Sequence, residues 1–281
     1  MRCDVVGQSA HMTTALRSLL FVPGGRADRI AKIGRFGADG VVLDLEDAVA
    51  VADKDSARAT VVAALSTLDV PEGTTVLVRV NAPGSPWFAE DVAAVKGTRA
   101  DGVVLPKLEH ADQLAGLGGM PIIGGLETAL GVADARPLLA TGAAMGLIGA
   151  YFGAEDFIAD MGGRRTAEST EVLYARSQVA LAARLAGVSA LDQVVTAVRD
   201  DEAFRRDAEQ ARALGYPGKL CIHPAQVALA HEIFTPSETE IVHARRVLEA
   251  SETGVGLLDG EMVDDVHVRM AHATLARAGA E

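Results

Sequence analysis

Hydrophobic positions along the chain gather in short runs that are rich in β-branched residues. Each run ends in a polar or glycine-bearing turn, and an amphipathic segment follows. Eight runs recur in this way: "RSLLFVPG" from Arg17, "DGVVLDLED" from Asp39, "TTVLVRVN" from Thr74, "DGVVLPK" from Asp101, "PIIGGLET" from Pro121, "AMGLIGAYFGAED" from Ala144, "VSALDQVV" from Val188 and "GKLCIHP" from Gly218. Near-continuous apolar strands that alternate with helices are typical of a parallel sheet covered by helices.

The segments between the runs have the spacing of helices. In "DKDSARATVVAAL" one helical face carries Ala57, Val61, Ala64 and Leu65. Eight strand–helix units before residue 235 predict an α/β fold of the (β/α)8 TIM barrel type. An open doubly wound sheet is the alternative. Its dinucleotide-binding form is disfavoured, because no G-x-G-x-x-G pattern follows the first strand.

A helical tail is predicted after the eighth unit. "TPSETEIVHARRVLEAS" places Ser237 three residues before Glu240, which is the spacing of a capping box. The glycine-punctuated "TGVGLLDGEMVDD" follows, and a last helix is predicted from about His267 to Ala278. The glycines of this stretch are either hinges or ordinary turns; they are Gly254, Gly256 and Gly260.

These patterns divide the chain into three parts. We expect a disordered N-terminal extension over residues 1–14, a (β/α)8 catalytic barrel over 15–235, and a C-terminal helical lid or oligomerisation extension over 236–281. The tail is too short to form an independent domain.

Composition and charge restrict the class of protein. With 49% hydrophobic but only 4% aromatic residues, the core must consist of Ala, Val, Leu and Ile, which suits closely packed helices on a sheet. A net charge of −12 argues against binding to nucleic acid, so an anionic substrate would need a local basic pocket.

No apolar run approaches the ~18 residues of a membrane helix, and the opening residues lack the apolar region of a signal peptide. Cys3 and Cys221 have no metal-ligand spacing and fit a reducing compartment. We therefore expect a cytoplasmic protein with small-molecule partners.

Carboxylates dominate the predicted strand ends, where (β/α)8 barrels carry their active sites. The strand ends deliver, in chain order, Arg26, Asp44, Glu46, Asp47, Arg79, Asn81, Lys107, Glu127, Glu155, Asp156, Asp192 and His223. Crowded carboxylates raise one another's pKa, and a bound divalent cation relieves this repulsion. Hard oxygen ligands without a Cys or His pair favour Mg²⁺ or Mn²⁺ over Zn²⁺.

Glu127 and Asp156 are the predicted metal ligands because they end neighbouring strands. Two carboxylates leave four octahedral positions for water and substrate, as is usual for Mg²⁺. Glu155 is the weaker candidate, because the side chains of adjacent residues point apart. The alternative for any single acid at a strand end is a helix cap or a solvated turn.

Ten short motifs occur in a fixed order between Arg17 and Asp264: "RSLLFVPG", "VVLDLEDAV", "LVRVN", "VVLPK", "LETALG", "FGAEDF", "YARS", "GKLCIHPAQV", "FTPSE" and "DGEMVD". In content and order they resemble the citrate lyase beta-chain-like proteins of the HpcH/HpaI aldolase family. Ten ordered motifs over almost the whole chain are a specific signal, whereas any one of them alone would be weak.

The resemblance implies a Mg²⁺-dependent carbon–carbon lyase with a (β/α)8 barrel and trimeric (or hexameric) assembly. Its substrate would be a short β-hydroxyacyl-CoA such as citryl-, malyl- or citramalyl-CoA, cleaved into (or formed from) an acyl-CoA and a 2-keto acid. Thioester hydrolysis is a further step that can follow. Two alternatives stay open: a metal-dependent aldolase on CoA-free 2-keto-hydroxy acids, and the beta subunit of a citrate lyase complex that receives its substrate on a carrier protein.

The resemblance also assigns residues. Glu127 of "LETALG" and Asp156 of "FGAEDF" resemble the metal ligands, and Arg79 of "LVRVN" resembles the arginine that holds the substrate carboxylate and carbonyl oxygen. Glu46 and Asp47 of "DLED" would bond to metal-bound waters.

Two further elements of the site follow from the same resemblance. The backbone N–H groups around Gly153, Ala154 and Glu155 resemble those that grip the keto-acid carboxylate. Asp264 of "DGEMVD" resembles a catalytic aspartate that a neighbouring subunit delivers on its C-terminal lid.

Other polar residues at the strand ends have two interpretations each. Lys107 is either a Schiff-base nucleophile or, as we favour, a cation paired with site carboxylates. His223 is either structural or close to the substrate, and Cys221 is expected in the core. The segment "ADMGGRRTAEST" either closes over the substrate or is a simple loop. Three basic residues are candidates for the CoA phosphates, although exposed helix residues often have no such role; they are Arg26, Arg29 and Lys32.

Overall fold

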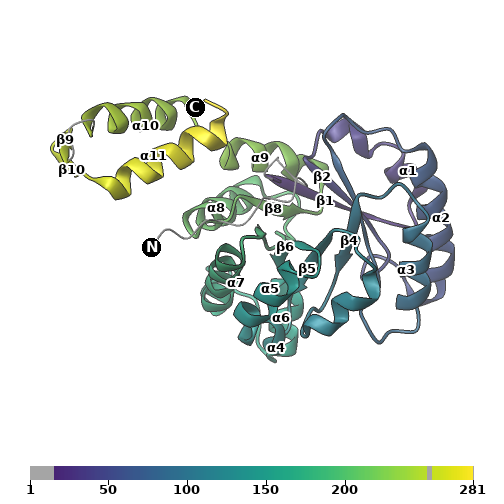
Figure 1. Cartoon of the computed structure of the whole chain (residues 1–281). Helices are drawn as coiled ribbons and strands as arrows, with labels where there is room; N and C mark the ends of the chain where they lie inside the picture. Colours follow the sequence, from purple (N-terminus) through teal and green to yellow (C-terminus); the bar gives the residue numbers. More distant parts are fainter. Residues whose placement is uncertain (1–15, 252–254, 281) are drawn as a thin grey trace.

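The computed structural model, which describes residues 16–251 and 255–280, contains a closed barrel of eight parallel strands (Figure 1). Each strand pairs with the next in chain order, and β1 pairs with β8 to close the barrel. The predicted (β/α)8 fold is therefore confirmed, and the open sheet is excluded. The strands are β1 (Ser18–Pro23), β2 (Gly40–Asp44), β3 (Thr75–Arg79), β4 (Gly102–Leu105), β5 (Ile122–Leu126), β6 (Leu147–Phe152), β7 (Ser189–Asp192) and β8 (Gly218–Cys221).

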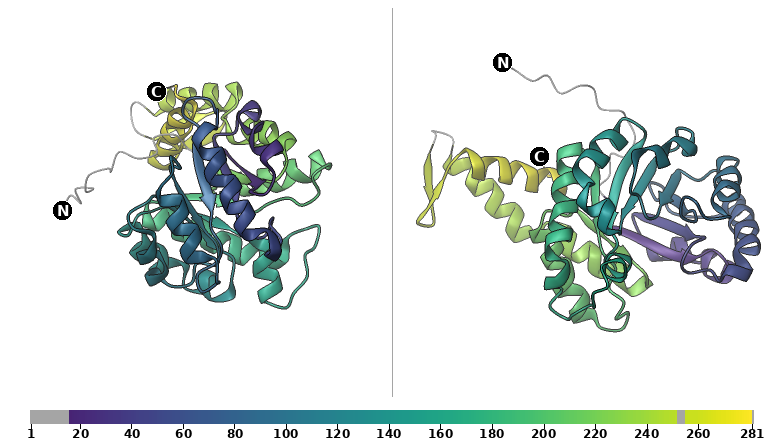
Figure 2. Two further views of the ribbon diagram at one scale, coloured as in Figure 1. Left: turned by 90° about the vertical axis from the view of Figure 1, so that its right-hand side faces the viewer. Right: turned by 90° about the horizontal axis from the view of Figure 1, so that it is seen from below.

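Helices connect the strands and cover the outside of the barrel (Figures 1 and 2). The α-helices of the barrel are α1 (Ala27–Ile30), α2 (Lys54–Thr67), α3 (Phe88–Lys96), α4 (Ala129–Ala133), α5 (Ala135–Ala143), α6 (Ala154–Asp160), α7 (Leu173–Ala186), α8 (Asp201–Ala213) and α9 (Pro224–Phe234). Short 3-10 helices cover Ile33–Phe36, Val51–Asp53, Ala111–Leu117 and Thr170–Val172. The one after β4 takes the place of an α-helix in the fourth unit. No helix in the described ranges is long and apolar enough to cross a membrane.

Both faces of the barrel strands are buried, which explains why the strands read as continuous apolar runs. Successive side chains alternate, so Leu19 and Leu77 point into the barrel while Leu20 and Val78 pack against the helices. The inner core consists of Leu16, Leu19, Val42, Leu77, Val104, Ile123, Tyr151, Leu191 and Leu220. Almost all of these are aliphatic, as the low aromatic content predicts.

The C-terminal tail forms an arm of two antiparallel helices joined by a hairpin, and it projects to one side of the barrel (Figure 1; Figure 2, right). The arm consists of α10 (Glu238–Ala250), β9 (Gly256–Leu258), β10 (Glu261–Val263) and α11 (Asp265–Ala278). It has a small core of its own, made by Ala244, Val247, Val263, Ala271 and Leu275. The predicted capping box is present, since Ser237 Oγ accepts the Glu240 N–H and Glu240 accepts the Ser237 N–H.

The glycine-rich stretch of the arm contains an ordered turn at Asp259 and Gly260. Asp259 and Gly260 both have positive φ, of 53° and 90°, which is the backbone of a type I′ hairpin turn. Gly256 lies within β9, and Gly254 falls outside the described residues. The expected disordered extension, residues 1–14, also falls outside them. The last helix begins at Asp265, two residues before the predicted start.

Candidate functional site

A cavity of about 370 Å³ opens at the carboxyl ends of the barrel strands. Its lining comes from the ends of seven strands and the residues that follow them: Phe21, Val22, Pro23, Arg29, Asp44, Asp47, Ala48, Arg79, Glu127, Tyr151, Gly153, Ala154, Glu155, Asp156, Val194, Leu220 and Ile222. The arm contributes none of these residues, so within one chain the arm does not cover this cavity.

Arg79 is fixed at one side of the cavity by a bidentate ion pair. Asp44, the last residue of β2, is the register partner of Arg79, the last residue of β3. The Arg79 guanidinium donates from Nε and Nη2 to the two Asp44 oxygens, each at 2.7 Å. Nη1 lies 3.1 Å from Glu46 Oε2 and 3.2 Å from Asp47 Oδ2. Burial alone would lower the pKa of Arg79, but Asp44 raises it well above its usual value. The side chain is therefore a permanent, rigid cation at the cavity wall.

Glu127 follows β5 and is buried, with its carboxylate facing the cavity. Within the described part of the chain both hydrogen bonds to this carboxylate end on Oε1, from the Lys107 N–H at 2.8 Å and the Tyr151 hydroxyl at 3.0 Å. Burial, with the negative charge of Glu46 second, raises the pKa of Glu127 to about 7. The other oxygen, Oε2, is left for a ligand in the cavity.

Two glycines make the space for this arrangement. A Cβ on Gly153 would lie 2.3 Å from Glu127 Oε2, so the end of β6 can approach the carboxylate only because residue 153 has no side chain. A Cβ on Gly125 would lie 2.4 Å from the Tyr151 hydroxyl. A glycine at 125 therefore admits the Tyr151 ring into the barrel, where its hydroxyl orients Glu127.

Lys107 connects two of the carboxylates at the mouth, Glu46 and Asp156. Its Nζ donates to Glu46 Oε1 at 2.7 Å and lies 3.3 Å from Asp156 Oδ1. The backbone of Lys107 has a φ of +51°, an unusual value for a residue with a side chain. Burial lowers the pKa of Lys107, but the hydrogen bond to Glu46 and the negative charges of Glu46, Glu127 and Asp156 together outweigh it, and the pKa is raised. A Schiff-base nucleophile needs a neutral amine, so this environment favours the paired cation.

The adjacent acids Glu155 and Asp156 begin α6 and diverge. Asp156 faces Lys107, whereas Glu155 accepts a hydrogen bond from Arg165 Nε at 3.0 Å. Both line the cavity. The divergence places Asp156 beside Glu127 and leaves Glu155 at the rim.

The donor set of the mouth suits a hard divalent cation. Among the described residues Glu46 Oε2 accepts no hydrogen bond and has only the ion pair with Arg79, and Glu127 Oε2 is open to the cavity. In the described ranges no three His, Cys, Asp or Glu side chains converge closely enough to hold a metal by themselves. Glu127 and Asp156 can thus supply two oxygen ligands, and water or substrate the rest, which is the pattern that Mg²⁺ prefers.

Asp264 lies far from this cavity within one chain. It is the N-cap of α11, where Oδ1 accepts the Val266 N–H at 2.9 Å and contacts His267 Nδ1 at 2.8 Å. The hydrogen bond with His267 lowers the pKa of Asp264. Within the described chain this carboxylate does not line the cavity.

The basic residues after β1 are not brought together. Arg29 lines the cavity, whereas Arg26 pairs with Asp28 at 2.8 Å and Lys32 is exposed outside it. At the eighth strand, His223 caps α9 by accepting the Ala225 N–H on Nδ1, and it does not line the cavity.

Cys221 is fully buried in the strand, as expected, and burial raises the pKa of its thiol to about 12. It therefore belongs to the core and takes no part in the site.

Asp44 and Tyr151 are two site residues whose contacts sequence reasoning missed. Asp44 was visible as a strand-end acid, but its ion pair with Arg79 depends on the register between β2 and β3. Tyr151 gave no signal, because it sits in a continuous apolar run where the inward face cannot be told from the outward one.

The chain matches the family model described as HpcH/HpaI aldolase/citrate lyase over residues 17–224. It is 48% identical to the citrate lyase subunit beta-like protein of Deinococcus radiodurans, over 93% of this chain and 96% of the relative. It is 33% identical to a (3S)-malyl-CoA thioesterase of Cereibacter sphaeroides, over 96% and 97% of the two chains. Among solved structures, CitE of Mycobacterium tuberculosis in complex with magnesium, acetoacetate and coenzyme A aligns with a TM-score of 0.84, at 37% identity, over 95% of this chain and 99% of that one.

Proposed function

Because the chain belongs to the HpcH/HpaI aldolase/citrate lyase family, we propose that it is a Mg²⁺-dependent carbon–carbon lyase acting on a short β-hydroxyacyl-CoA. Its substrate would be of the citryl-, malyl- or citramalyl-CoA type, and its products an acyl-CoA and a 2-keto acid. The observation that carries this proposal is the single cavity that Glu127, Asp156 and the fixed cation of Arg79 line together. The similar CitE structure with magnesium, acetoacetate and coenzyme A supports it.

We assign Glu127 and Asp156 as the Mg²⁺ ligands. A bound Mg²⁺ supplies Lewis-acid polarisation of the keto-acid carbonyl. The hydrogen bonds to Glu127 Oε1 turn its second oxygen toward the cavity. Lys107 neutralises part of the negative charge of Glu46 and Asp156, so an anionic substrate can enter.

Arg79 would stabilise the oxygen on which charge develops. In the cleavage direction the β-hydroxyl loses its proton, and the bond between that carbon and the α-carbon of the thioester breaks. The electron pair of the bond passes to the thioester as an enolate, which then takes up a proton to give the acyl-CoA. A fixed guanidinium at the cavity wall favours this charge development without reorganisation. The Asp44 pair keeps Arg79 in place through the reaction.

The proton acceptor and donor at the α-carbon is proposed to be Asp264 of a neighbouring copy in a homotrimer. The arm supports this proposal, since it projects from the barrel and exposes apolar side chains, among them Leu257 and Met270 at 72% and 63%. Replacement by Asp264→Ala should abolish turnover but leave Mg²⁺ and keto-acid binding unchanged. Loss of Mg²⁺ binding in this variant would contradict the assignment.

Binding of CoA would rely on Arg29, which is exposed and lines the cavity. A guanidinium can pair with a phosphate or polar group at the cavity entrance.

The direct experiment is a panel of purified β-hydroxyacyl-CoA esters, assayed for the acyl-CoA and keto-acid products with Mg²⁺ and with EDTA. EDTA-sensitive release of both products from one ester is the expected result, and it names the substrate. Free CoA should be measured as well, because one relative is named a thioesterase. Its release would show that hydrolysis of the thioester follows the cleavage. If no ester is cleaved, the proposal fails, and CoA-free hydroxy-keto acids and carrier-bound substrates become the functions to test.

A further inference from the structure

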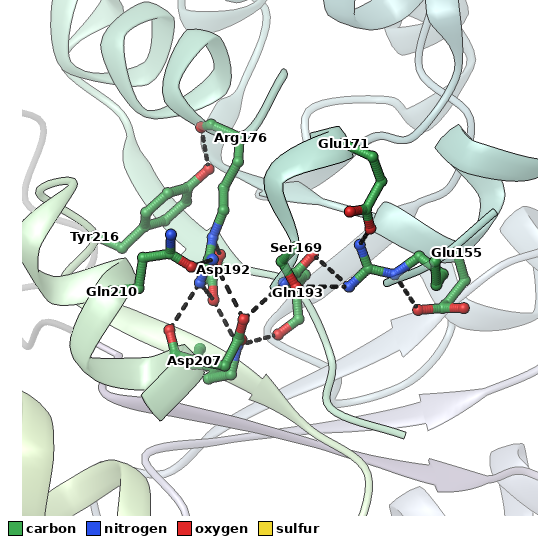
Figure 3. A network of polar contacts seen from close by, with 11 residues as sticks. Glu155, Ser169, Glu171, Arg176, Asp192, Gln193, Asp207, Gln210 and Tyr216 are labelled. Carbon is green, nitrogen blue, oxygen red and sulfur yellow. Dashed lines mark hydrogen bonds and ion pairs between the residues drawn. The ribbon is translucent and has the colours of Figure 1, made fainter. Parts of the chain in front are cut away.

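We propose that Arg165 is a positioning residue for the barrel-mouth site, which fixes the first turn of α6 and thereby the side chain of Asp156. The inference rests on the proposed function for the identity of that site. Arg165 lies in the loop between α6 and α7 and does not line the cavity itself. It acts through Glu155, which lines the cavity and is labelled in the network of polar contacts in Figure 3.

The guanidinium of Arg165 is engaged on two sides. Nε donates to Glu155 Oε1 at 3.0 Å, and Nη1 donates to Glu171 Oε1 at 2.6 Å. Nη2 makes longer contacts with Ser169 Oγ, at 3.5 Å, and Gln193 Oε1, at 3.4 Å. The planar fork of an arginine suits this role, because one side chain can hold two carboxylates in fixed directions.

The loop that carries Arg165 is itself anchored. Glu171 accepts the Thr166 N–H at 3.2 Å and the Thr166 hydroxyl at 2.5 Å. Ser169 is buried with a φ of +53°, a strained conformation for a residue with a side chain. Such a conformation persists when the surrounding contacts determine it, so the contacts of Arg165 and Glu171 hold this loop in one shape.

Gln193 links the loop to the buried ion cluster behind β7 and β8 (Figure 3). Its Nε2 donates to Asp207 Oδ1 at 2.8 Å, and Asp207 Oδ2 pairs with Lys219 Nζ at 2.5 Å. Through Gln193, Arg165 thus connects the loop between α6 and α7 to the buried ion pairs of the barrel.

The start of α6 depends on outside contacts, because Gly153 offers no side-chain cap. Two cations hold its first turn from opposite sides: Lys107 near Asp156 and Arg165 at Glu155. Arg165 also neutralises Glu155, which would otherwise present an unpaired negative charge to an anionic keto acid at the cavity rim. Without Arg165, Asp156 would lose part of its fixed position and Glu155 would be free to turn inward.

The test compares Arg165→Ala with Arg164→Ala. Arg164 is the adjacent arginine, is exposed, and forms no ion pair with the residues that the structure describes, so its loss changes the net charge equally. The readouts are Mn²⁺ affinity by electron paramagnetic resonance without substrate, KM and kcat of the lyase reaction, and the unfolding temperature. We expect Arg165→Ala to weaken Mn²⁺ binding about tenfold and to raise KM by a similar factor, with kcat changed less than about threefold. Arg165→Lys should recover part of the loss, and Arg164→Ala should match the wild type.

The inference is overturned if Arg165→Ala has the same Mn²⁺ affinity and the same KM as Arg164→Ala. If Arg165→Ala lowers only the unfolding temperature, Arg165 has a purely structural role. If Arg165→Ala does not fold, Glu171→Gln replaces it, because that substitution loosens Arg165 from the opposite side; an unchanged Mn²⁺ affinity there counts equally against the inference. A wild type that binds Mn²⁺ but cleaves no ester refutes the proposed function only, since Mn²⁺ affinity still decides the role of Arg165. A wild type that binds no Mn²⁺ overturns both.

Discussion

Two clusters of charged side chains lie on the same barrel, and their charge balance differs. Behind β7 and β8, two cations face two carboxylates: Arg176 and Lys219 with Asp192 and Asp207. At the mouth, among the residues that the structure describes, three cations face five carboxylates: Arg79, Lys107 and Lys54 with Asp44, Glu46, Asp47, Glu127 and Asp156. The first cluster is neutral within itself, whereas the second has an excess of negative charge.

The difference appears in the pKa values of the acids. Burial raises the pKa of Asp207, but Lys219 and Arg176 outweigh it and the pKa is lowered. Burial and nearby acids raise the pKa of Glu127 to about 7. Burial raises the pKa of both carboxylates, Glu127 being fully and Asp207 largely buried, so the supply of cations decides the direction of the net shift. The balanced cluster can hold the fold together, and the unbalanced one is suited to bind a cation.

The largest effect is expected at the unbalanced cluster. Glu127→Gln keeps the shape of the side chain and its hydrogen bonds to Oε1 but removes a proposed metal ligand, so turnover with Mg²⁺ should fall by roughly 10³-fold or more. The free energy of unfolding without metal should not fall, because a buried and poorly compensated charge has been removed. Steady-state kinetics and urea unfolding measure the two quantities. Glu168→Gln, an exposed acid outside the mouth, is the charge-matched control.

Lys219→Met breaks the balanced cluster and should affect stability instead. It leaves the fully buried Asp192 and the largely buried Asp207 with Arg176 as their remaining cation, so we expect a loss of about 3–5 kcal/mol in the free energy of unfolding. Lys96→Met, on the exposed end of α3, controls for the loss of charge. A loss below about 1 kcal/mol would show that this cluster does not stabilise the barrel.

A smaller effect is expected for Lys107→Met, which removes a cation from the mouth. Pairing with Glu46 and Asp156 predicts a drop of about 10–100-fold in kcat/KM. Borohydride reduction with a 2-keto acid should trap no covalent adduct, because the raised pKa keeps the amine protonated. An adduct on Lys107, detected by mass spectrometry, would make this residue a Schiff-base nucleophile.

The smallest effect is a pH dependence of the balanced cluster. The folded pKa of Asp207 lies below its unfolded value of 3.8, so its contribution to stability is complete above that pH and is lost as the pH falls through the folded pKa. The stability difference between wild type and Asp207→Asn should therefore be constant near neutral pH and shrink below about pH 4. Urea unfolding at several pH values measures it. A difference that grows in acid would contradict the sign of the shift.

The fold could be predicted from the sequence because each barrel strand is a continuous apolar run that ends in a turn. Strand ends also identified Arg79, Glu127 and Asp156, which line one cavity in the structure. The pairing of Arg79 with Asp44 could not be predicted from the sequence, since it depends on the register between β2 and β3. The β9–β10 hairpin was missed although "LLDGEMV" holds an Asp-Gly pair, a strong hairpin signal.

Asp264 illustrates a different limit. Its motif is visible in the sequence, but its side chain caps α11 on the arm and lies outside the cavity of its own chain. Contacts between chains are not encoded in the local patterns from which helices and strands are predicted.

We propose that the excess of carboxylates at the mouth forms a divalent-cation site. Titration calorimetry of Mg²⁺ into the wild-type protein and into Glu127→Gln, at neutral pH and without substrate, is the decisive experiment. We expect one Mg²⁺ site per chain in the wild type and its loss in the variant. Equal Mg²⁺ binding by both proteins, or none by the wild type, would contradict it.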